Sequence, residues 1–218
     1  MEILYQDHRI VVCVKPAGIL STDEPGGLPE LLRAEICDKS NTCIRTVHRL
    51  DRVVGGVMVL ARSREAARIL SAQIQNHETG KTYLAVVAGT PEQKEDTWTD
   101  LLWRSKEEKK TYVVAEPGKD VQVAVLDYRV LAGNGEFSLV KIQLHTGRTH
   151  QIRAQFSAHG HPIVGDRKYG GMERAGEGIA LWCHSMEICH PQSGENMTFT
   201  AKPPQEWPWS LFCEAHTI

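Results

Sequence analysis

Residues 48–56, His48-Arg49-Leu50-Asp51-Arg52-Val53-Val54-Gly55-Gly56, form a charged loop with a glycine turn. An apolar run of strand length, residues 57–61, follows it directly. This order predicts a loop that presents a carboxylate between arginines and then turns into a buried strand. Positive charge nearby keeps a carboxylate ionised, and such a group can act as a nucleophile or a general base. The alternative interpretation is an ordinary surface salt bridge of Asp51.

A second group combines a cation with an aromatic ring, Lys81-Thr82-Tyr83. It opens a predicted strand over residues 82–87, whose side chains alternate between two faces. An aromatic ring in such a strand can stack on a nucleic-acid base, and a phenol can share a proton. Plain core or edge packing of the ring is the alternative.

A third group is the polar run Thr146-Gly147-Arg148-Thr149-His150-Gln151-Ile152-Arg153. It predicts a short helix over residues 149–159, capped by Thr146 or Thr149, with Arg148 in the first turn. A cation there opposes the helix dipole, so Arg148 is expected to have a carboxylate or phosphate partner. Residues 141–169 hold five lysines and arginines against the single acid Asp166, which suggests a local basic face. A capped helix with incidental arginines is the alternative.

The other patterns predict mainly short strands with a few irregularly placed helices. Strands are expected at residues 2–5, 9–14, 98–103, 111–115, 121–131, 137–144, 180–189 and 197–201, and helices at 29–37 and 63–77. The segments 121–131 and 137–144 are expected to pair antiparallel across the turn 133–135. This organisation predicts one α+β domain over residues 1–218, and it leaves open a division into two lobes around 91–120.

Composition excludes several classes of protein. The chain of 218 residues is 41% hydrophobic and 24% charged, which is ordinary for a globular protein. It has no apolar run of the roughly 20 residues that a membrane helix needs, and its start lacks a secretory signal, so a cytoplasmic protein is expected. The net charge of −2 gives no overall signature of nucleic-acid binding.

Metal and cofactor motifs are absent from the sequence. None of the six cysteines forms a Cys-x-x-Cys pair, so reduced thiols are expected rather than a zinc ribbon. The histidines do not occur in an HExxH pattern, and phosphate-loop and dinucleotide fingerprints are missing as well. The sequence therefore predicts a protein without metal or cofactor.

Taken together, these motifs resemble those of the RluA-type pseudouridine synthases. The resemblance includes the openings Ile3-Leu4-Tyr5-Gln6-Asp7 and Lys15-Pro16-Ala17-Gly18, the three groups above, and Gly160-His161-Pro162-Ile163-Val164-Gly165-Asp166. The motifs occur in the family's order from about residue 2 to residue 201. The resemblance implies an α+β fold with a mixed, largely antiparallel bent sheet flanked by helices. It also implies a single catalytic domain, here without the S4-like module that many members carry.

The resemblance further implies an enzyme that converts uridine to pseudouridine in ribosomal or transfer RNA and uses no cofactor. The protein is expected to act as a monomer. Asp51 resembles the essential aspartate, Tyr83 the tyrosine that packs on the flipped base, and Arg148 the cation that pairs with Asp51. Arg49 resembles the arginine that fills the gap left by the target uridine. The other residues expected to bind the substrate are His48, Arg52, Lys81 and Arg153.

The sequence leaves the role of the carboxylate open between attack at C1′, addition to C6 and removal of a sugar proton. It also departs from the family, because Val54-Gly55 stands where members usually have Thr-Ser ahead of a glycine. A catalytically silent RNA-binding protein of the same fold is therefore an alternative, and a metal-dependent hydrolase is another. The contacts that select the RNA are expected in loops 21–40 and 91–120.

Overall fold

The computed structural model describes residues 1–36, 43–172 and 178–216, so Cys37 at the end of the first predicted helix lies outside them. The chain divides into two compact units. Unit 1 comprises Met1–Lys81 and Trp182–Pro203, and unit 2 comprises Thr82–Leu181 and Pro204–Ile218. The division falls at 81/82 and 181/182, outside the 91–120 region considered from the sequence.

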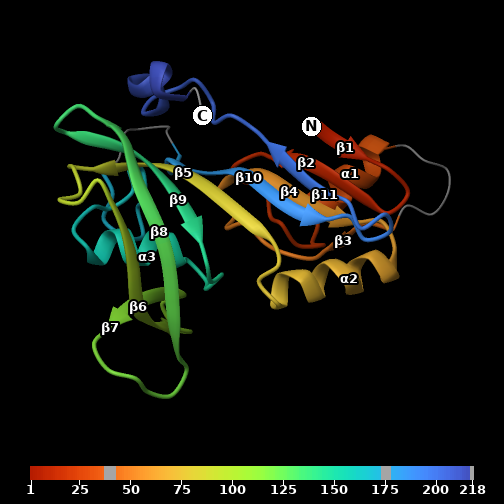
Figure 1. Ribbon diagram of the computed structural model, residues 1–218, viewed down its shortest axis with the longest axis horizontal. Coiled ribbons are helices and arrows are strands. Elements are labelled where there is room, and N and C mark those ends of the chain that lie inside the picture. Colours follow the sequence, from red (N-terminus) through yellow and green to blue (C-terminus); the bar gives the residue numbers. More distant parts are fainter. Residues whose placement is uncertain (37–42, 173–177, 217–218) are drawn as a thin grey trace. The chain divides into compact units, whose positions relative to one another are not determined.

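Unit 1 is a mostly antiparallel sheet with two helices (Figure 1). Its main strands run in the order β1 (Ile3–Gln6), β2 (Ile10–Lys15), β4 (Gly55–Ala61) and β10 (Leu181–Cys189), with β11 (Asn196–Thr200) paired to β10 and β3 (Arg45–Thr46) paired to β4. Only the β4–β10 pair is parallel among the pairs described in this unit. The helices are α1 (Leu28–Ile36) and α2 (Arg64–Gln75).

Strand β4 is the centre of unit 1. All its residues are buried, as its continuous apolar sequence predicts for a strand covered on both faces. One edge pairs with β2, whereas the other pairs with β10 at Gly55 and Gly56 and with β3 at Leu60 and Ala61. A Cβ atom at Gly56, which has φ of +122°, would collide with the main chain of Cys183. The glycine turn is therefore required by the close approach of β10.

Helix α2 covers the apolar core that β2, β4 and β10 build, and its residues Ala66 and Leu70 belong to the same buried cluster as Val57 and Val59. Ser63 is its N-cap, and the Ser63 side chain accepts a hydrogen bond from Ala66 N at 3.0 Å. This confirms the predicted start of the helix and places its end within the predicted range.

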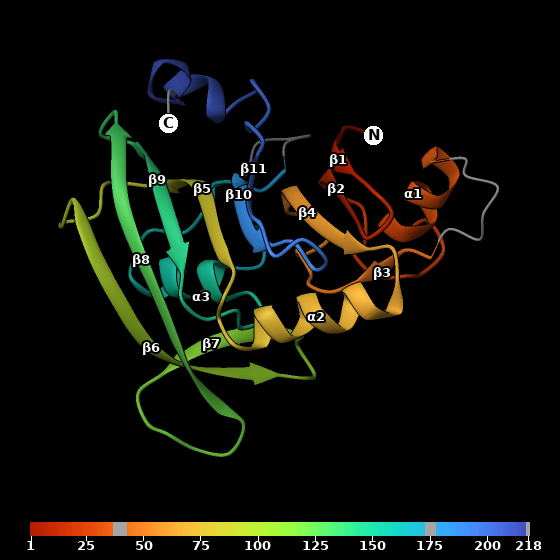
Figure 2. The same cartoon turned by 45° about the vertical axis from the view of Figure 1, so that its right-hand side comes forward.

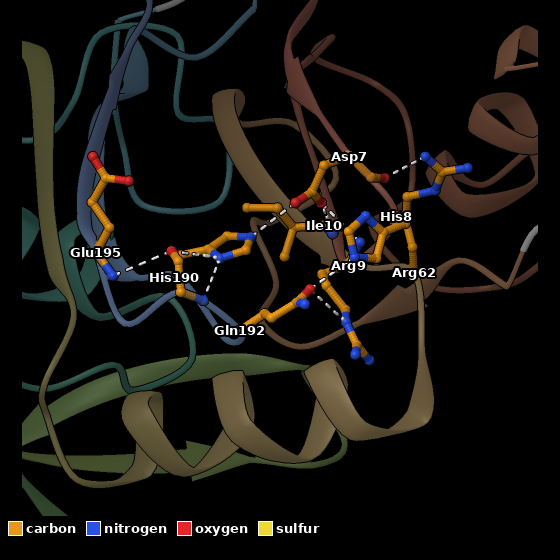
Figure 3. Close-up of polar contacts among 9 residues, drawn as sticks. Asp7, His8, Arg9, Ile10, Arg62, His190, Gln192 and Glu195 are labelled. Carbon is orange, nitrogen blue, oxygen red and sulfur yellow. Dashed lines mark hydrogen bonds and ion pairs between the residues drawn. The ribbon is translucent and has the colours of Figure 1, made fainter.

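A polar network joins the β1–β2 turn of unit 1 to the β10–β11 turn (Figure 3). Asp7 Oδ1 accepts the backbone N–H groups of Arg9 and Ile10, each at 2.8 Å. Asp7 Oδ2 lies 3.0 Å from His190 Nε2, and His190 Nδ1 accepts Ser193 N–H at 3.1 Å. Because Nδ1 is the acceptor, Nε2 carries the proton that is donated to Asp7. Burial raises the pKa of Asp7, but the hydrogen bonds and His190 outweigh it and lower that pKa overall.

Unit 2 is an antiparallel sheet with one helix against it (Figure 2). Its strands are ordered β5 (Gly80–Ala88), β9 (Phe137–Leu144), β8 (Val121–Gly133), β6 (Glu95–Ser105) and β7 (Lys110–Val114). Helix α3 (Gln151–Ala158) packs on β6 and β7, where the ring of Trp98 stacks on His159 with centroids 3.9 Å apart. The 3-10 helix η1 (Trp209–His216) was not predicted from the sequence, and neither was β3.

The predicted α+β class with a largely antiparallel sheet is confirmed, as are the positions of the other predicted strands to within a few residues. The predicted hairpin of 121–131 and 137–144 corresponds to β8 and β9, which are antiparallel. Its turn contains Gly135 with φ of +89°, and Asn134 Oδ1 accepts Phe137 N–H at 2.8 Å. Among the residues described, none of the helices is long and apolar enough to cross a membrane.

The Asp7 network predicts a pH-dependent contribution to the stability of unit 1. The lowered pKa of Asp7 means that its charge stabilises the folded state above the ordinary value of 3.8, and that this part is lost as the pH falls through the folded value. We expect Asp7→Asn to lower the free energy of unfolding by about 1–2 kcal/mol at pH 7. The difference from wild type should shrink below about pH 4, measured by thermal unfolding. The exposed Glu92→Gln is the control; a pH-independent difference for Asp7→Asn would contradict the assignment.

Candidate active site

The loop that carries Asp51 lies between β3 and β4 in unit 1. Its side chains alternate, since His48 and Leu50 are buried, Arg49 is exposed and Asp51 is half-buried. The buried members anchor the loop in unit 1, and the other two present a cation and a carboxylate next to each other.

His48 completes the edge of β4. Its Nε2 atom accepts Val59 N–H at 3.1 Å, on the part of β4 between the residues that pair with β10 and those that pair with β3. Burial lowers the pKa of His48 well below its ordinary value, and the charge of Lys81 lowers it further. His48 is therefore neutral near pH 7. Because its Nε2 atom is bonded to the main chain of β4, its position suits support of the loop rather than the direct substrate contact expected from the sequence.

Ser21 and Thr46 fix the other side of the loop. Ser21 Oγ donates to Leu50 O at 2.8 Å and accepts Leu50 N–H at 3.2 Å. Thr46 Oγ1 donates to Ser21 O at 2.9 Å. Both main-chain groups of the residue before Asp51 are thus held by one buried hydroxyl.

Lys15 is the residue that sequence reasoning missed. Its side chain is fully buried, and its Nζ donates to Pro16 O at 2.9 Å, to Ile19 O at 2.8 Å and to Arg52 O at 3.3 Å. Burial lowers the pKa of Lys15 to about 8, while the nearby charge of Asp51 acts in the opposite direction. Two signals in the sequence point to it: its place in the motif Lys15-Pro16-Ala17-Gly18, and its position at the end of an otherwise apolar strand.

The turn after Asp51 is closed by the main chain. Val54 N–H donates to Asp51 O at 3.0 Å, so the turn holds without the side-chain hydroxyls that this sequence lacks. Arg52 is exposed but partly engaged, because Arg52 O accepts Gly18 N–H at 2.7 Å and Arg52 Nε donates to Gly18 O at 2.9 Å. The loops 15–18 and 51–54 are therefore locked together.

Lys81 is also in unit 1, near the start of β5. Burial lowers its pKa, and Cys183 opposes this shift. Unit 1 thus holds five of the eight predicted site residues: His48, Arg49, Asp51, Arg52 and Lys81.

Unit 2 holds the other three, Tyr83, Arg148 and Arg153. Tyr83 is 7% exposed and lies opposite Ile142 of β9. Arg148 precedes α3 instead of lying in its first turn, and its Nε donates to Val123 O at 3.0 Å. The N-cap is His150 in the left-handed conformation with no side-chain cap hydrogen bond, so the predicted caps Thr146 and Thr149 are wrong.

These two residues do not cap the helix because they make contacts with strands distant in the sequence. Thr146 Oγ1 is used by the sheet, where it accepts Val125 N–H at 2.8 Å, and Thr149 O accepts the Thr111 hydroxyl at 2.8 Å. Both threonines therefore tie the segment before α3 to neighbouring strands.

Arg153 is part of the core of unit 2. Its guanidinium binds both carboxylate oxygens of Asp166, with Nε–Oδ2 at 2.7 Å and the second contact at 2.8 Å. Asp166 is 1% exposed and Arg153 is 7% exposed. Because Asp166 engages its guanidinium, Arg153 does not suit the substrate contact expected of it, and one cation is removed from the basic face predicted over residues 141–169.

Within residues 1–36, 43–172 and 178–216, no three His, Cys, Asp or Glu side chains are grouped so that they could hold a metal ion. The chemistry that the described groups offer is that of a carboxylate, a phenol and guanidinium groups. These can supply a nucleophile or base, a stacking surface and anion binding.

Comparison with known proteins identifies relatives over nearly the whole chain. Residues 9–158 match the family model described as RNA pseudouridylate synthase. A Yersinia pestis protein named dual-specificity RNA pseudouridine synthase RluA is 36% identical, with 91% of this chain and 97% of that protein aligned. The tRNA pseudouridine synthase C of the same organism is 33% identical over 95% of this chain and 88% of its own.

Solved structures show the same fold. The structure titled Human RNA Pseudouridylate Synthase Domain Containing 1 aligns with a TM-score of 0.80, covering all of this chain and 95% of the human one. At 22% identity this similarity supports the fold alone.

The Lys15 anchor yields a prediction for stability. Lys15→Met would remove the charged donor that binds the carbonyls of Pro16, Ile19 and Arg52, so we expect a loss of about 2–4 kcal/mol in the free energy of unfolding at pH 7. The folded pKa of about 8 lies below the ordinary 10.5, so the folded state binds fewer protons between these values. Wild type should therefore gain stability relative to the variant as the pH rises from 8 to 10.5. Urea unfolding of both proteins at the two ends of this pH range measures the difference in unfolding free energy. A difference that does not change with pH would contradict the buried charge of Lys15.

The Arg153–Asp166 pair yields a second prediction. Arg153→Met would leave the Asp166 carboxylate buried without its partner, so we expect a loss of about 3–5 kcal/mol in unfolding free energy. The double change Arg153→Met with Asp166→Leu should recover most of it, because no unpaired charge is left. Arg167→Met, at an exposed neighbour, is the control. A small loss for Arg153→Met with weakened RNA binding would instead restore its predicted role as a substrate contact.

Proposed function

The chain belongs to the RNA pseudouridylate synthase family, with RluA-type relatives, and from this we propose that it isomerises specific uridines of ribosomal or transfer RNA to pseudouridine, with Asp51 as the catalytic carboxylate. The observation that carries the proposal is the anchored loop around Asp51. Lys15 and Ser21 hold its main chain, and the His48 side chain ties the loop to β4. Arg49 and Asp51 are adjacent, accessible charged members of the loop.

The reaction sets the requirements for the carboxylate. The bond between C1′ and N1 breaks, the uracil turns, and C1′ bonds to C5, which loses a proton while N1 gains one. The reaction is therefore an isomerisation that needs no oxidant or reductant. Asp51 can serve by attacking C1′, by adding to C6 or by removing a sugar proton. Each route requires a carboxylate held in a fixed position, which the anchored loop supports.

The remaining roles rest on the resemblance. We assign Arg49 to the space that the target uridine leaves when it swings out of the RNA, a step that costs a few kcal/mol. Its exposed position next to Asp51 suits this role. Tyr83 is assigned to the face of the flipped base, and Arg148 to the pairing with Asp51. Arg52 and Lys81 are proposed to bind the substrate, whereas His48 and Arg153 are now assigned to positioning.

We further propose that the two units serve one catalytic domain and that the enzyme works as a monomer. Since the proposed substrate is cellular RNA, we propose a cytoplasmic location. No step of the proposed mechanism uses a metal ion or an organic cofactor.

The test is mass-spectrometric mapping of pseudouridine in total RNA from cells with and without this gene. We expect at least one site to vanish on deletion, to return with the wild-type gene and to stay absent with Asp51→Asn. Asp120→Asn is the matched control, because Asp120 is exposed and has φ of +62°, a conformation that asparagine tolerates.

The contrary outcomes separate the alternatives. If Asp51→Asn restores the missing site, the catalytic role of Asp51 is wrong. If no site changes on deletion while the purified protein still binds RNA, the protein is the catalytically silent RNA-binding alternative.

A further inference from the structure

Unit 2 has an apolar sheet face that its own helix leaves uncovered. In the ladders of β6, β7 and β8, Trp103 lies opposite both Tyr112 and Val121, and Leu101 lies opposite both Val114 and Val123. Directly opposed residues project from the same face of a sheet. We call these residues the aromatic face: Leu101, Trp103, Tyr112, Val114, Val121 and Val123.

The other face of the same strands forms the core. There Leu102 and Ala124 pack with Ala154 of α3 and with Tyr169. Trp103 is 39% exposed and Val123 is 48% exposed, whereas Leu102 is 3% exposed. A large ring and a valine exposed on the same face of a sheet are the kind of apolar patch that marks a binding surface.

The rings of the aromatic face are held in place. Trp103 and Tyr112 are stacked, with centroids 6.3 Å apart and planes inclined by 27°. The Tyr112 hydroxyl donates to Glu108 Oε2 at 2.6 Å, which fixes the orientation of its ring. A rigid aromatic surface binds a planar ligand with little loss of side-chain freedom.

Cations border the aromatic face at two edges. On the β7 side, Lys110 Nζ lies 5.2 Å from the ring centroid of Tyr112 and 5.1 Å from that of Tyr169. On the β8 side, Arg148 Nε is bonded to the carbonyl of Val123. The six residues of the face itself carry no charge. An uncharged stacking surface with a cation at each of two edges suits a polymer of flat bases and phosphates better than it suits an apolar protein segment.

We propose that the aromatic face is an RNA-binding platform, on which Trp103 stacks an unpaired base of the substrate while Lys110 contacts a neighbouring phosphate. This inference rests on the proposed function for its ligand, RNA. It adds a contact surface that begins at β8, to which Arg148 is bonded, and extends to the β6–β7 hairpin. That hairpin lies within the 91–120 region expected to select the RNA.

The test measures the affinity for a short fluorescein-labelled oligouridylate by fluorescence anisotropy. Trp103→Ala should weaken binding by about 10- to 100-fold, since stacking on an aromatic ring is lost. Trp103→Phe should stay close to wild type, and Trp103→Leu should behave like Trp103→Ala, because only the aromatic change keeps a stacking surface. Lys110→Gln should reduce the salt dependence of binding by about one phosphate contact.

Leu211→Ala is the matched control, because Leu211 is a 43% exposed apolar residue of unit 2 on η1 and not on the aromatic face. It should bind like wild type. Wild-type affinity in both Trp103→Ala and Trp103→Leu would overturn the inference. So would a change from dimer to monomer on Trp103→Ala with unchanged RNA affinity, since the face would then join two copies of the chain.

Pseudouridine formation, assayed on total RNA from the deletion strain, separates this inference from the proposed function. If wild type and Trp103→Ala modify that RNA equally and bind the oligouridylate equally, the platform is wrong and the synthase assignment stands. If the wild-type protein forms no pseudouridine but the Trp103→Ala variant binds RNA more weakly than wild type, the synthase assignment is wrong and the binding platform stands.

Discussion

A buried ammonium group is the interaction on which the candidate active site depends. Lys15 Nζ binds the carbonyls of Pro16 and Ile19 in its own loop and that of Arg52 next to Asp51. Because the side chain is fully buried, water does not reach it to replace these bonds. A carboxylate that must meet a reacting atom with small positional error needs support of this kind. The charge of Asp51 in turn favours the protonated form of Lys15, so anchor and carboxylate support each other.

In both units, charged and polar residues of the sequence motifs position the chain. His48 in unit 1 accepts a main-chain N–H of β4, and Arg153 in unit 2 binds Asp166 while its guanidinium lies 5.1 Å from the ring of Tyr169. Within each motif, buried residues therefore hold the segment and exposed ones remain for the ligand. Arg49 next to His48 illustrates the division, because adjacent positions of one loop have opposite exposure.

Much of the fold was predictable because its signals are local. The apolar run of β4, the N-cap Ser63 and the glycine turn between β8 and β9 each specify their element within a few residues. The helix cap near residue 150 was not predictable, because Thr146 and Thr111 bond to partners distant in the sequence. The aromatic face was also hidden, since it arises only when β6, β7 and β8 pair in their observed register.

The order of the elements, the family and the candidate residues follow from the amino-acid sequence, because alternation, turn residues and motif spacing are properties of neighbouring positions. Which of the charged residues are buried depends on the three-dimensional packing. His48 and Arg153 stand in the same kind of polar motif as exposed Arg49 and Arg52. Their roles differ because strands far apart in the chain, such as β4 and β10, come together and enclose some side chains while leaving others in water. Burial is a property of that assembly, and it turns a charge into either an anchor or a contact for the ligand.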